Sequence, residues 1–334
     1  MRAWQMVSGG GIDSLSLVEM ASPQPGPGEI KVRVRASSLN YRDLSTVKDP
    51  IGRGLALPMS PNSDAAGDVV AVGAGVTRFK AGDRVASCFF RDWPDGTCTP
   101  EAMAGALGGT ANGVLAEEII LKDTGAVHMP AHLTYEEGAT LPCAALTAWH
   151  ALVEAGGLKA GDTVLLLGTG GVSIFALQFA TLFGARAIVT SSSDEKLQRA
   201  ALMGASTTIN YRTTPDWDKA VLEATEGRGV DITVEVGGAG TLPRSVSATR
   251  VAGTVSLIGV LTGGEINPTA VMRKSIRLQG IYVGSRRMFE DMNRAIASSG
   301  LKPVVDRTFG FDEARAAFHA MEAAGHFGKI VIRV

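Results

Sequence analysis

Residues Val164–Ser173 read VLLLGTGGVS, and this stretch decides the fold. Its apolar start has the composition of a buried strand, Gly168 permits a sharp turn, and Gly170 and Gly171 open an apolar segment that reads as a helix. A strand, a glycine-rich turn and a helix together bind the pyrophosphate of a dinucleotide, because backbone N–H groups at the helix N-terminus face the anion. Ser173 replaces the third glycine of the usual fingerprint and is small enough for close helix–strand packing. Taken alone, the motif also suits an ordinary βα turn, so its surroundings decide between the two.

Strand-like and helix-like segments alternate around this turn and favour the dinucleotide interpretation. The expected strands are 163–167, 186–191, 207–209, 232–236, 254–258 and 277–283, and the expected helices between them are 171–183, 194–203, 215–225 and 239–249. Strands that alternate with helices of about ten residues indicate a parallel sheet covered on both faces. Helices at 287–298 and 312–323 and a strand at 329–334 are expected to follow.

The chain before residue 125 reads as β-rich. Ile30, Val32 and Val34 alternate with charged residues, a period of two that is typical of a half-buried strand. Short β-branched runs punctuated by glycine follow at 65–73 and 82–85, and they indicate a small barrel or sandwich. Residues 91–115 form a long irregular stretch, which we expect to be a lid or a subunit contact.

Length and composition exclude several classes of protein. The 334 residues suggest two domains of about 100–200 residues each. The 32 basic and 33 acidic residues leave a net charge of −1, so nucleic acids and acidic membrane surfaces are poor partners. Three cysteines argue against a disulfide framework and for a reducing compartment. Since we find neither the apolar core of a signal peptide nor an apolar run of about 20 residues, the expected location is cytoplasmic.

The end of the second expected strand bears on the choice of cofactor. NAD sites place an Asp or Glu there to hold the ribose 2′-hydroxyl, whereas residues 190–193 read TSSS and Asp194 is expected to cap the next helix. Hydroxyl and basic groups accept a 2′-phosphate that a carboxylate would repel. The groups expected to bind it are Ser191, Ser192, Lys196, Tyr211 and Arg212. The sequence therefore favours NADP(H) over NAD(H), although Lys196 also suits a solvated helix surface.

The order of these features resembles the medium-chain dehydrogenase/reductase superfamily over essentially the whole chain. The resemblance rests on GDVVAVG at 67–73, GDRV at 82–85, the turn at 168–173, GA at 204–205, INY at 209–211 and GRGVD at 227–231. WPDG at 93–96, GVLAE at 113–117, SSSDEK at 191–196 and HFGK at 326–329 are similar to a branch described as zinc-type alcohol dehydrogenase-like or quinone oxidoreductase-like.

This resemblance implies an α/β fold of two domains with a cleft between them. Residues 1–126 and 285–334 would form a GroES-like β-barrel catalytic domain, and residues 127–284 a Rossmann NADP(H)-binding domain with a doubly wound parallel sheet. Members of the superfamily commonly form homodimers by pairing the last Rossmann strand, here 277–283. The cofactor contacts that the resemblance implies, besides those above, are Thr147, Gly168, Thr169, Gly170, Gly171, Val172, Gly259, Val260, Tyr282, Val283, Phe327 and Lys329.

The resemblance also places Asn40 and Tyr41 beside the nicotinamide. Asn40 would hold the ribose or the amide group of the cofactor. Tyr41 would donate a proton or a hydrogen bond to the substrate oxygen, or it would only wall the pocket. Asp43 and Asp64 match acidic positions near the metal of the zinc enzymes, and here we expect structural roles for both.

The ligands of the zinc enzymes are missing from the matching positions. Zinc alcohol dehydrogenases use Cys, His and Cys, and this chain has Asn40, Ser63 and Cys143 there. Cys88 and Cys98 lack the companions that a second, structural zinc requires. We therefore expect no bound metal, and we expect Cys143 to behave as a small buried hydrophobe.

A reductase without a Lewis acid needs a substrate that already accepts hydride well. Quinones and α,β-unsaturated carbonyls qualify, because conjugation spreads the developing negative charge. The sequence thus predicts an NADPH-dependent, zinc-independent oxidoreductase of such acceptors. Two alternatives stay open: a zinc-less dehydrogenase of alcohols or carbonyls, and an NADPH-binding protein without turnover.

Overall fold

The computed structural model describes residues 1–334, and the chain divides into two compact units. Unit 1 comprises Met1–Leu146 and Val283–Val334, and unit 2 comprises Thr147–Tyr282. The first boundary lies 20 residues beyond the predicted 126, since 146 − 126 = 20. Residues 127–146 belong to unit 1 because Tyr135 donates a hydrogen bond to Asp68 and Glu136 accepts one from Arg333 at 2.8 Å. No helix in either unit has both the length and the apolar character that a bilayer span requires.

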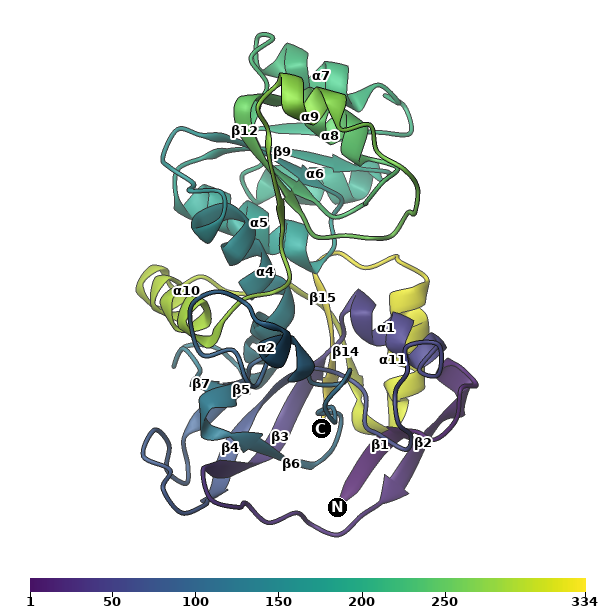
Figure 1. The fold of residues 1–334 in the computed structure, drawn as a ribbon, viewed down its shortest axis with the longest axis vertical. Helices are drawn as coiled ribbons and strands as arrows, with labels where there is room; N and C mark the ends of the chain where they lie inside the picture. Colours follow the sequence, from purple (N-terminus) through teal and green to yellow (C-terminus); the bar gives the residue numbers. More distant parts are fainter. The chain divides into compact units, whose positions relative to one another are not determined.

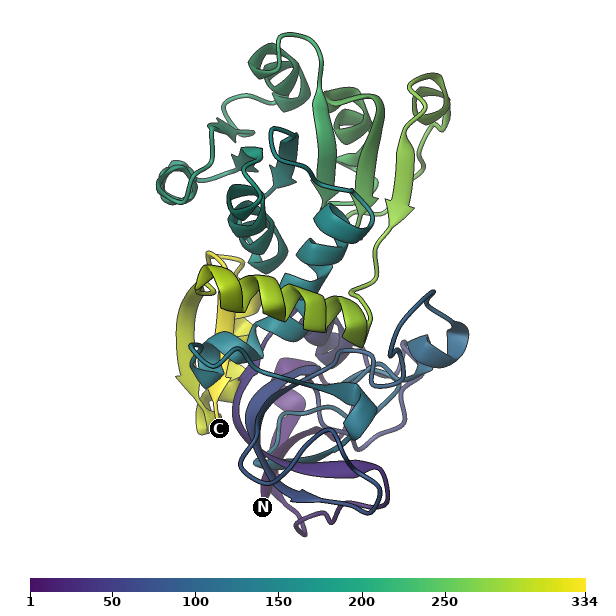
Figure 2. The same ribbon diagram turned by 90° about the vertical axis from the view of Figure 1, so that its left-hand side faces the viewer.

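Unit 2 is built on a six-stranded parallel sheet with the order β10-β9-β8-β11-β12-β13. Its strands are β8 (Thr163–Leu167), β9 (Arg186–Ser191), β10 (Thr207–Asn210), β11 (Val230–Glu235), β12 (Thr249–Leu257) and β13 (Arg277–Gly280). Its helices are α5 (Gly171–Leu182), α6 (Asp194–Leu202), α7 (Trp217–Ala224), α8 (Leu242–Ala248) and α9 (Thr269–Arg273). Counted from β8, the order is 3-2-1-4-5-6, which is the doubly wound Rossmann arrangement. Helices lie beside the strands in both views (Figure 1, Figure 2).

The sequence of β8 explains its central place. All five of its residues are buried, as expected of a parallel strand that is covered on both faces. Leu165 and Leu167 pack in one core cluster with Ile188 of β9 and Trp217 of α7. This packing fixes the position of the turn that leaves the end of β8.

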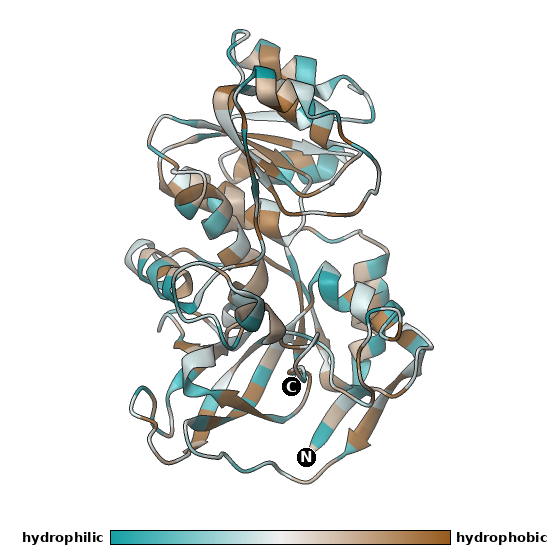
Figure 3. Ribbon diagram, viewed as in Figure 1, coloured by the Kyte–Doolittle hydropathy of each residue, from teal (hydrophilic) through white to brown (hydrophobic).

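Unit 1 contains a seven-stranded, mainly antiparallel sheet and a two-stranded sheet. The large sheet has the order β14-β15-β3-β4-β5-β7, with β6 paired to β3. Its strands are β3 (Glu29–Ser38), β4 (Asp64–Val72), β5 (Arg84–Ser87), β6 (Glu118–Lys122), β7 (Ala126–His128), β14 (Val305–Gly310) and β15 (Lys329–Arg333), and β1 (Arg2–Met6) pairs with β2 (Leu15–Glu19). Hydrophilic and hydrophobic residues alternate along these strands (Figure 3). Ile30, Val32 and Val34 are buried, which confirms the predicted half-buried strand.

The helices and short turns outside the two sheets belong to unit 1 or to the segment where the chain passes from unit 1 into unit 2. They are α1 (Tyr41–Lys48), α2 (Pro100–Ala104), α3 (Tyr135–Ala139), α4 (Leu146–Trp149), α10 (Arg286–Ser299) and α11 (Ala314–Glu322), with π-helical turns at Leu141–Ala145 and His150–Glu154 and 3-10 turns at Ile12–Ser14, Asp123–Gly125 and Phe311–Glu313. The stretch 91–115, expected to be irregular, contains only α2 as regular structure. Pro100 begins that helix and Thr99 caps it by accepting a hydrogen bond from the Ala102 N–H.

Candidate active site

The glycine-rich turn after β8 has the geometry of an anion cradle. Gly168 has a φ of +73°, a conformation that strongly favours glycine. Gly170 is the N-cap of α5 with a φ of −78°, so its backbone would accept any residue. A Cβ atom built at Gly170 meets no protein atom within 4 Å. Neither strain nor packing within the protein explains this glycine, and the open space at the helix N-terminus fits a bound pyrophosphate.

Ser173 fulfils the packing role that the sequence assigns to it. Its side chain is buried, and its Oγ donates a hydrogen bond of 2.6 Å to the carbonyl oxygen of Leu167, the last residue of β8. The hydroxyl thus ties the first turn of α5 to the end of the strand. The third glycine of the fingerprint permits the same close approach of helix and strand.

The end of β9 presents hydroxyl groups, as the sequence predicts. Ser191 is the last strand residue, and Ser193 caps α6 through a 3.4 Å hydrogen bond from the Lys196 N–H to its Oγ. The expectation that Asp194 caps this helix is wrong by one residue. Asp194 is the first residue of α6, and its Oδ1 accepts a 2.7 Å hydrogen bond from Asn210 Nδ2 at the end of β10.

The end of β10 lies against the end of β9. Tyr211 follows β10, and its N–H donates a 3.0 Å hydrogen bond to the carbonyl oxygen of Ser191. The side chains of Tyr211 and Arg212 are exposed, and Ser192 and Lys196 are half-buried. The structure therefore brings the groups expected to bind the 2′-phosphate to one edge of the unit 2 sheet.

Glu235, at the end of β11, is a residue that the sequence analysis missed. Its carboxylate is fully buried and accepts hydrogen bonds from the N–H groups of Gly237 at 2.7 Å and Gly238 at 3.0 Å. Two hydroxyls, from Thr241 at 2.6 Å and from Ser245, complete its partners. This carboxylate fixes the turn after β11, beside β8 at the point where the strand order reverses. A carboxylate at the end of an apolar strand, followed by two glycines, is the signal that marks it in the sequence.

The remaining cofactor residues predicted in unit 2 show different environments. Gly259 cannot be replaced, because a Cβ there would lie 1.6 Å from the carbonyl oxygen of Val236. Val260 and Tyr282 are large exposed hydrophobic residues, whereas Thr147 and Thr169 are buried. Exposed apolar side chains beside the strand ends suit contact with a ligand.

A second group of predicted residues meets in unit 1, where β3 leads into α1. Asn40 is the N-cap of α1, and its N–H donates a 2.9 Å hydrogen bond to Oδ2 of Asp43. Asp43 is fully buried and also pairs with Arg42 at 3.2 Å. The expected structural role of Asp43 is thus confirmed: its carboxylate closes the capping box of α1. Tyr41, the first residue of the helix, is 54% exposed.

The Asn40 side chain lies between a cation and a hydroxyl. Its Oδ1 accepts a hydrogen bond of 2.5 Å from the ammonium of Lys329, which also donates to the carbonyl oxygen of Leu39 at 2.5 Å. Its Nδ2 donates to Ser63 Oγ at 3.5 Å. Lys329, the first residue of β15, is only 3% exposed. The structure therefore brings together Asn40 and Lys329, two site residues that the sequence predicts separately.

Asp64 joins this group to Cys143. Its Oδ1 accepts a 2.5 Å hydrogen bond from Ser63 Oγ, and its Oδ2 accepts 3.2 Å and 3.5 Å bonds from the Cys143 N–H and Ser38 Oγ. Burial raises the pKa of the Asp64 carboxyl, and the nearby ammonium of Lys329 opposes that rise. Burial also raises the pKa of the Cys143 thiol, with the neighbouring Asp64 adding to the shift. The thiol is therefore held in its protonated form, which is a poor nucleophile and a poor metal ligand.

The three positions aligned with zinc ligands thus converge on Asp64. They present an amide, a hydroxyl and a protonated thiol, and the structure has no group of three or more His, Cys, Asp or Glu side chains placed to hold a metal ion. Tetrahedral zinc sites in proteins are built from deprotonated thiolate, imidazole and carboxylate ligands, so these residues do not fit a catalytic zinc.

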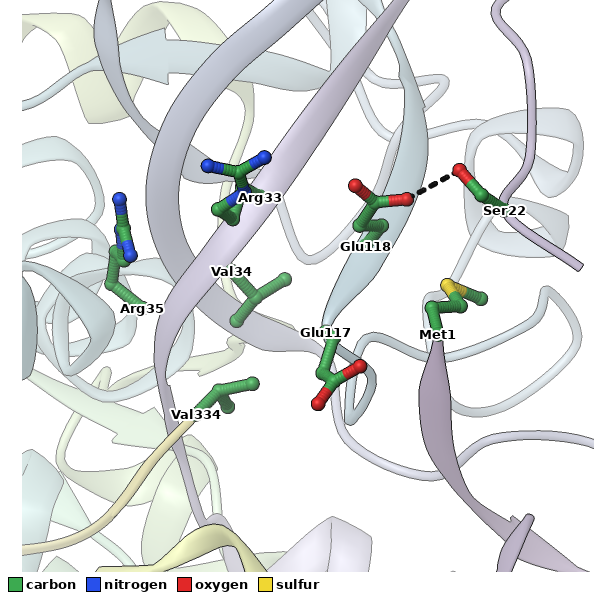
Figure 4. Close-up of a pocket in the computed structure, with 8 residues that line it drawn as sticks. All are labelled: Met1, Ser22, Arg33, Val34, Arg35, Glu117, Glu118 and Val334. Atoms are coloured by element: carbon green, nitrogen blue, oxygen red, sulfur yellow. Dashed lines mark hydrogen bonds between the residues drawn. The ribbon is translucent and has the colours of Figure 1, made fainter. Parts of the chain in front are cut away.

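A pocket of about 450 Å³ lies elsewhere in unit 1, beside both ends of the chain (Figure 4). It is lined by Met1, Ser22, Arg33, Val34, Arg35, Glu117, Glu118 and Val334. Its acidic residues pair with cations of the same unit, Glu117 with Arg2 at 2.8 Å and Glu118 with Lys31 at 2.9 Å. None of the predicted site residues lines it, so it takes no part in the candidate site.

Two family models match successive parts of the chain. Residues 26–131 match the family model of the alcohol dehydrogenase GroES-like domain, and residues 171–298 match that of the zinc-binding dehydrogenases. Together with the Rossmann sheet of unit 2, these matches show that the chain belongs to the medium-chain dehydrogenase/reductase superfamily. They confirm the resemblance and the fold class that the sequence predicts.

Individual relatives match along nearly the whole chain. A zinc-type alcohol dehydrogenase-like protein of Schizosaccharomyces pombe is 43% identical over 97% of this chain and 96% of its own. Crotonyl-CoA reductase of Streptomyces collinus is 30% identical, covering 95% and 81%, and rat quinone oxidoreductase is 27% identical, covering 99% and 97%. The chain is accordingly an oxidoreductase of this superfamily.

Solved structures give the same result. A putative alcohol dehydrogenase from Sinorhizobium meliloti superimposes with a TM-score of 0.93 at 44% identity, covering 100% of this chain and 98% of that one. A mycobacterial protein complexed with NADPH superimposes with a TM-score of 0.84 at 27% identity, covering 100% of both chains.

Proposed function

We propose that the protein is an NADPH-dependent, zinc-independent oxidoreductase that transfers hydride to an α,β-unsaturated carbonyl or a quinone. The observation that carries the proposal is the network around Asp64. Asn40, Ser63 and Cys143 stand at the positions aligned with zinc ligands. The Asn40 amide and the Ser63 hydroxyl are hydrogen-bonded within the protein, and the Cys143 backbone N–H donates to Asp64. An acceptor activated by its own conjugation needs no Lewis acid at this place.

The preference for NADPH is supported by the edge of the unit 2 sheet. The strand β9 ends on Ser191, and no carboxylate occupies that position to hold a ribose 2′-hydroxyl or repel a 2′-phosphate. Ser192, Lys196, Tyr211 and Arg212 follow on the same edge. Similarity to a protein complexed with NADPH agrees with this preference.

In the proposed reaction the residues of the chain bind, orient and supply a proton. When bound, NADPH would supply the hydride, either to the β carbon of an enone or to a quinone. The turn at Gly170 would bind the pyrophosphate, and the family resemblance assigns the amide of Asn40 to the nicotinamide end. The Tyr41 hydroxyl donates a hydrogen bond or a proton to the substrate oxygen, where the negative charge develops. One proton completes either product: the enolate becomes the saturated carbonyl, and the quinone that has accepted hydride becomes the hydroquinone.

A panel of acceptors tests the proposed function. Purified protein dialysed against EDTA is expected to oxidise NADPH in the presence of enones or quinones and to leave simple alcohols and NADP⁺ unchanged, as followed by the loss of absorbance of NADPH. Turnover of simple alcohols without turnover of enones and quinones would support a dehydrogenase instead. Tight NADPH binding without any turnover would support a binding protein.

Replacement of Tyr41 by phenylalanine tests the proton donor. If its hydroxyl acts on the substrate oxygen, kcat is expected to fall by about 10-fold or more, since general acid catalysis typically contributes about 10²–10⁴-fold. The KM for NADPH should change little, because the ring and the cap of α1 remain. Steady-state kinetics with one enone measure both constants, and an unchanged kcat would leave Tyr41 as a wall of the pocket.

We further propose a cytoplasmic homodimer that pairs β13 with its copy. Strand β13 (Arg277–Gly280) is an edge of the unit 2 sheet, so the backbone groups on its outer side lack a partner strand within the chain. Sedimentation velocity at micromolar concentration is expected to give the mass of two chains. A monomer across the accessible concentrations would contradict this assembly.

A further inference from the structure

Glu235, the last residue of β11, is a buried carboxylate whose hydrogen-bond partners are all neutral. Every residue of β11 is buried, and Glu235 itself has no exposed surface. Its oxygen atoms accept hydrogen bonds from two backbone N–H groups and two hydroxyls, those of Gly237, Gly238, Thr241 and Ser245. Burying a carboxylate is costly unless hydrogen bonds satisfy its lone pairs. The carboxylate and its four donors therefore hold one another in a single arrangement.

The turn after β11 is joined to the turn after β12. The N–H of Thr262 donates a 3.1 Å hydrogen bond to the carbonyl oxygen of Gly237. The side chain of Thr262 adds a second tie, because its Oγ1 accepts a 2.8 Å hydrogen bond from the Gly240 N–H. Residues 236–241 and 258–262 therefore form one structure, which we call the double turn.

Two residues at the tip of the double turn are apolar and exposed. Val260 is 83% exposed and Leu261 is 53% exposed. The chain is held on both sides of them, since the Gly259 N–H donates to the carbonyl oxygen of Glu235 at 3.1 Å and Thr262 is bonded to the other turn. An anchored loop that exposes large apolar side chains suits contact with a ligand.

The strand order assigns the double turn to one half of the dinucleotide. The turn after β8 faces the pyrophosphate, and the groups proposed for the 2′-phosphate follow β9 and β10. In the order β10-β9-β8-β11-β12-β13, the double turn lies on the other side of β8. Because a dinucleotide binds across the point where the strand order reverses, its adenosine half takes the side of β9 and its nicotinamide half takes the side of β11 and β12.

We propose that Glu235 is a positioning residue, whose carboxylate holds the double turn so that Val260 and Leu261 wall the nicotinamide half of the bound cofactor. This role rests on the proposed function, in which NADPH is the cofactor, and it needs only residues of unit 2. The two apolar side chains would shield the reduced ring from water, whereas Glu235, with no exposed surface, does not touch the cofactor. Loss of the carboxylate should therefore weaken the binding of the nicotinamide half and spare the adenosine half.

Two substitutions of Glu235 separate its hydrogen bonds from its charge. In Glu235→Gln the amide oxygen can accept from the three donors of Oε1, and Nε2 can donate to the Ser245 hydroxyl. Its Kd for NADPH, measured by the change in NADPH fluorescence, is expected to stay within about twofold of the wild-type value. Glu235→Leu pairs with none of these donors, and its Kd should rise by about tenfold or more. A loss of about tenfold in Glu235→Gln, or wild-type affinity in Glu235→Leu, would overturn the proposal.

A cofactor fragment shows which half of the nucleotide site is affected. Adenosine 2′,5′-bisphosphate lacks the nicotinamide half, so calorimetric titration is expected to give Glu235→Leu an affinity for it within about twofold of the wild-type value. Equal losses of NADPH and fragment would overturn the proposal, because the substitution would then disturb the whole nucleotide site.

An exposed variant protects the test against misfolding of Glu235→Leu. Thr262→Val keeps the shape of the side chain and removes its bond to Gly240, so the Kd for NADPH should rise about three- to fivefold in a folded protein. Thr225→Val is the matched control: Thr225 Oγ1 also accepts from a glycine, the Gly229 N–H at 3.0 Å, but it lies before the opposite end of β11. An unchanged Kd in Thr262→Val, or an equal rise in Thr225→Val, would overturn the proposal.

A double-mutant cycle tests whether the double turn acts through its tip. Val260→Ser removes apolar surface at an exposed position and should raise the Kd for NADPH by about threefold. In this background Thr262→Val is expected to add less than about twofold, because both substitutions affect one contact, and fully additive effects would overturn the proposal. Affinities that behave as expected in a protein that reduces none of the acceptors would refute the proposed reaction and leave the positioning role of Glu235 supported.

Discussion

Replacing Gly170 by valine is expected to raise the Kd for NADPH by more than about 100-fold while the protein stays folded. A Cβ at this position meets no protein atom within 4 Å, and the φ of −78° and ψ of −177° are open to every residue. The free energy of unfolding should therefore fall by no more than about 1 kcal/mol, because valine is a poorer N-cap residue than glycine. The bulk of the valine would fill the space in front of the N-terminus of α5, where backbone N–H groups face the pyrophosphate, and a loss of about 100-fold corresponds to about 2.7 kcal/mol of binding free energy.

The measurement is a fluorescence titration with NADPH beside a thermal unfolding curve. Gly310→Val is the matched control, because Gly310 is also an N-cap with an ordinary φ of −73°, and a Cβ there meets only the end of the Glu313 side chain, at 3.3 Å. It should leave NADPH binding within about twofold, since distant sites act independently. Tight NADPH binding by Gly170→Val would show that the pyrophosphate lies elsewhere.

The sequence predicts unit 2 well because its signals are local. A buried strand, a glycine-rich turn and the following helix are all encoded within 20 residues, and the structure confirms each at the expected place. The predicted ends of strands are less accurate where a β-bulge interrupts the pairing of two strands. The expected strand 254–258 begins earlier, at Thr249, because the pairing of β11 with β12 shifts register and Ala252 takes a φ of +57°. A bulge of this kind interrupts the apolar pattern from which a strand is recognised.

The polar network around Asn40 and Asp64 in unit 1 could not be predicted from sequence patterns. Asn40, Ser63 and Cys143 are recognisable only as departures from a family motif, and nothing local indicates what replaces the zinc. The partner of Asn40 comes from β15, at the other end of the chain. Glu235 was missed for a different reason: the sequence reads it as one more residue of the expected strand 232–236, whereas its oxygen atoms accept hydrogen bonds from backbone and hydroxyl groups within ten residues.

Replacing Lys196 by glutamate is expected to reverse the preference from NADPH to NADH without destabilising helix α6. The substitution puts a carboxylate beside the proposed site of the 2′-phosphate, so the KM for NADPH should rise by about 100-fold from the reversal of charge. The KM for NADH, which lacks this phosphate, should stay within about twofold. Steady-state kinetics with both cofactors and one acceptor give the two constants.

The position of Lys196 in α6 separates an effect on cofactor binding from an effect on helix stability. Ser193 is the N-cap and already accepts a hydrogen bond from the Lys196 N–H. Glutamate three residues after a capping serine completes a capping box, in which its carboxylate accepts from the N–H of the cap. The helix is therefore expected to keep or gain stability in Lys196→Glu, and Lys196→Gln is the neutral control with an intermediate rise in the KM for NADPH. Equal losses with NADPH and NADH would remove Lys196 from the phosphate site, because a cause common to both cofactors cannot be the 2′-phosphate.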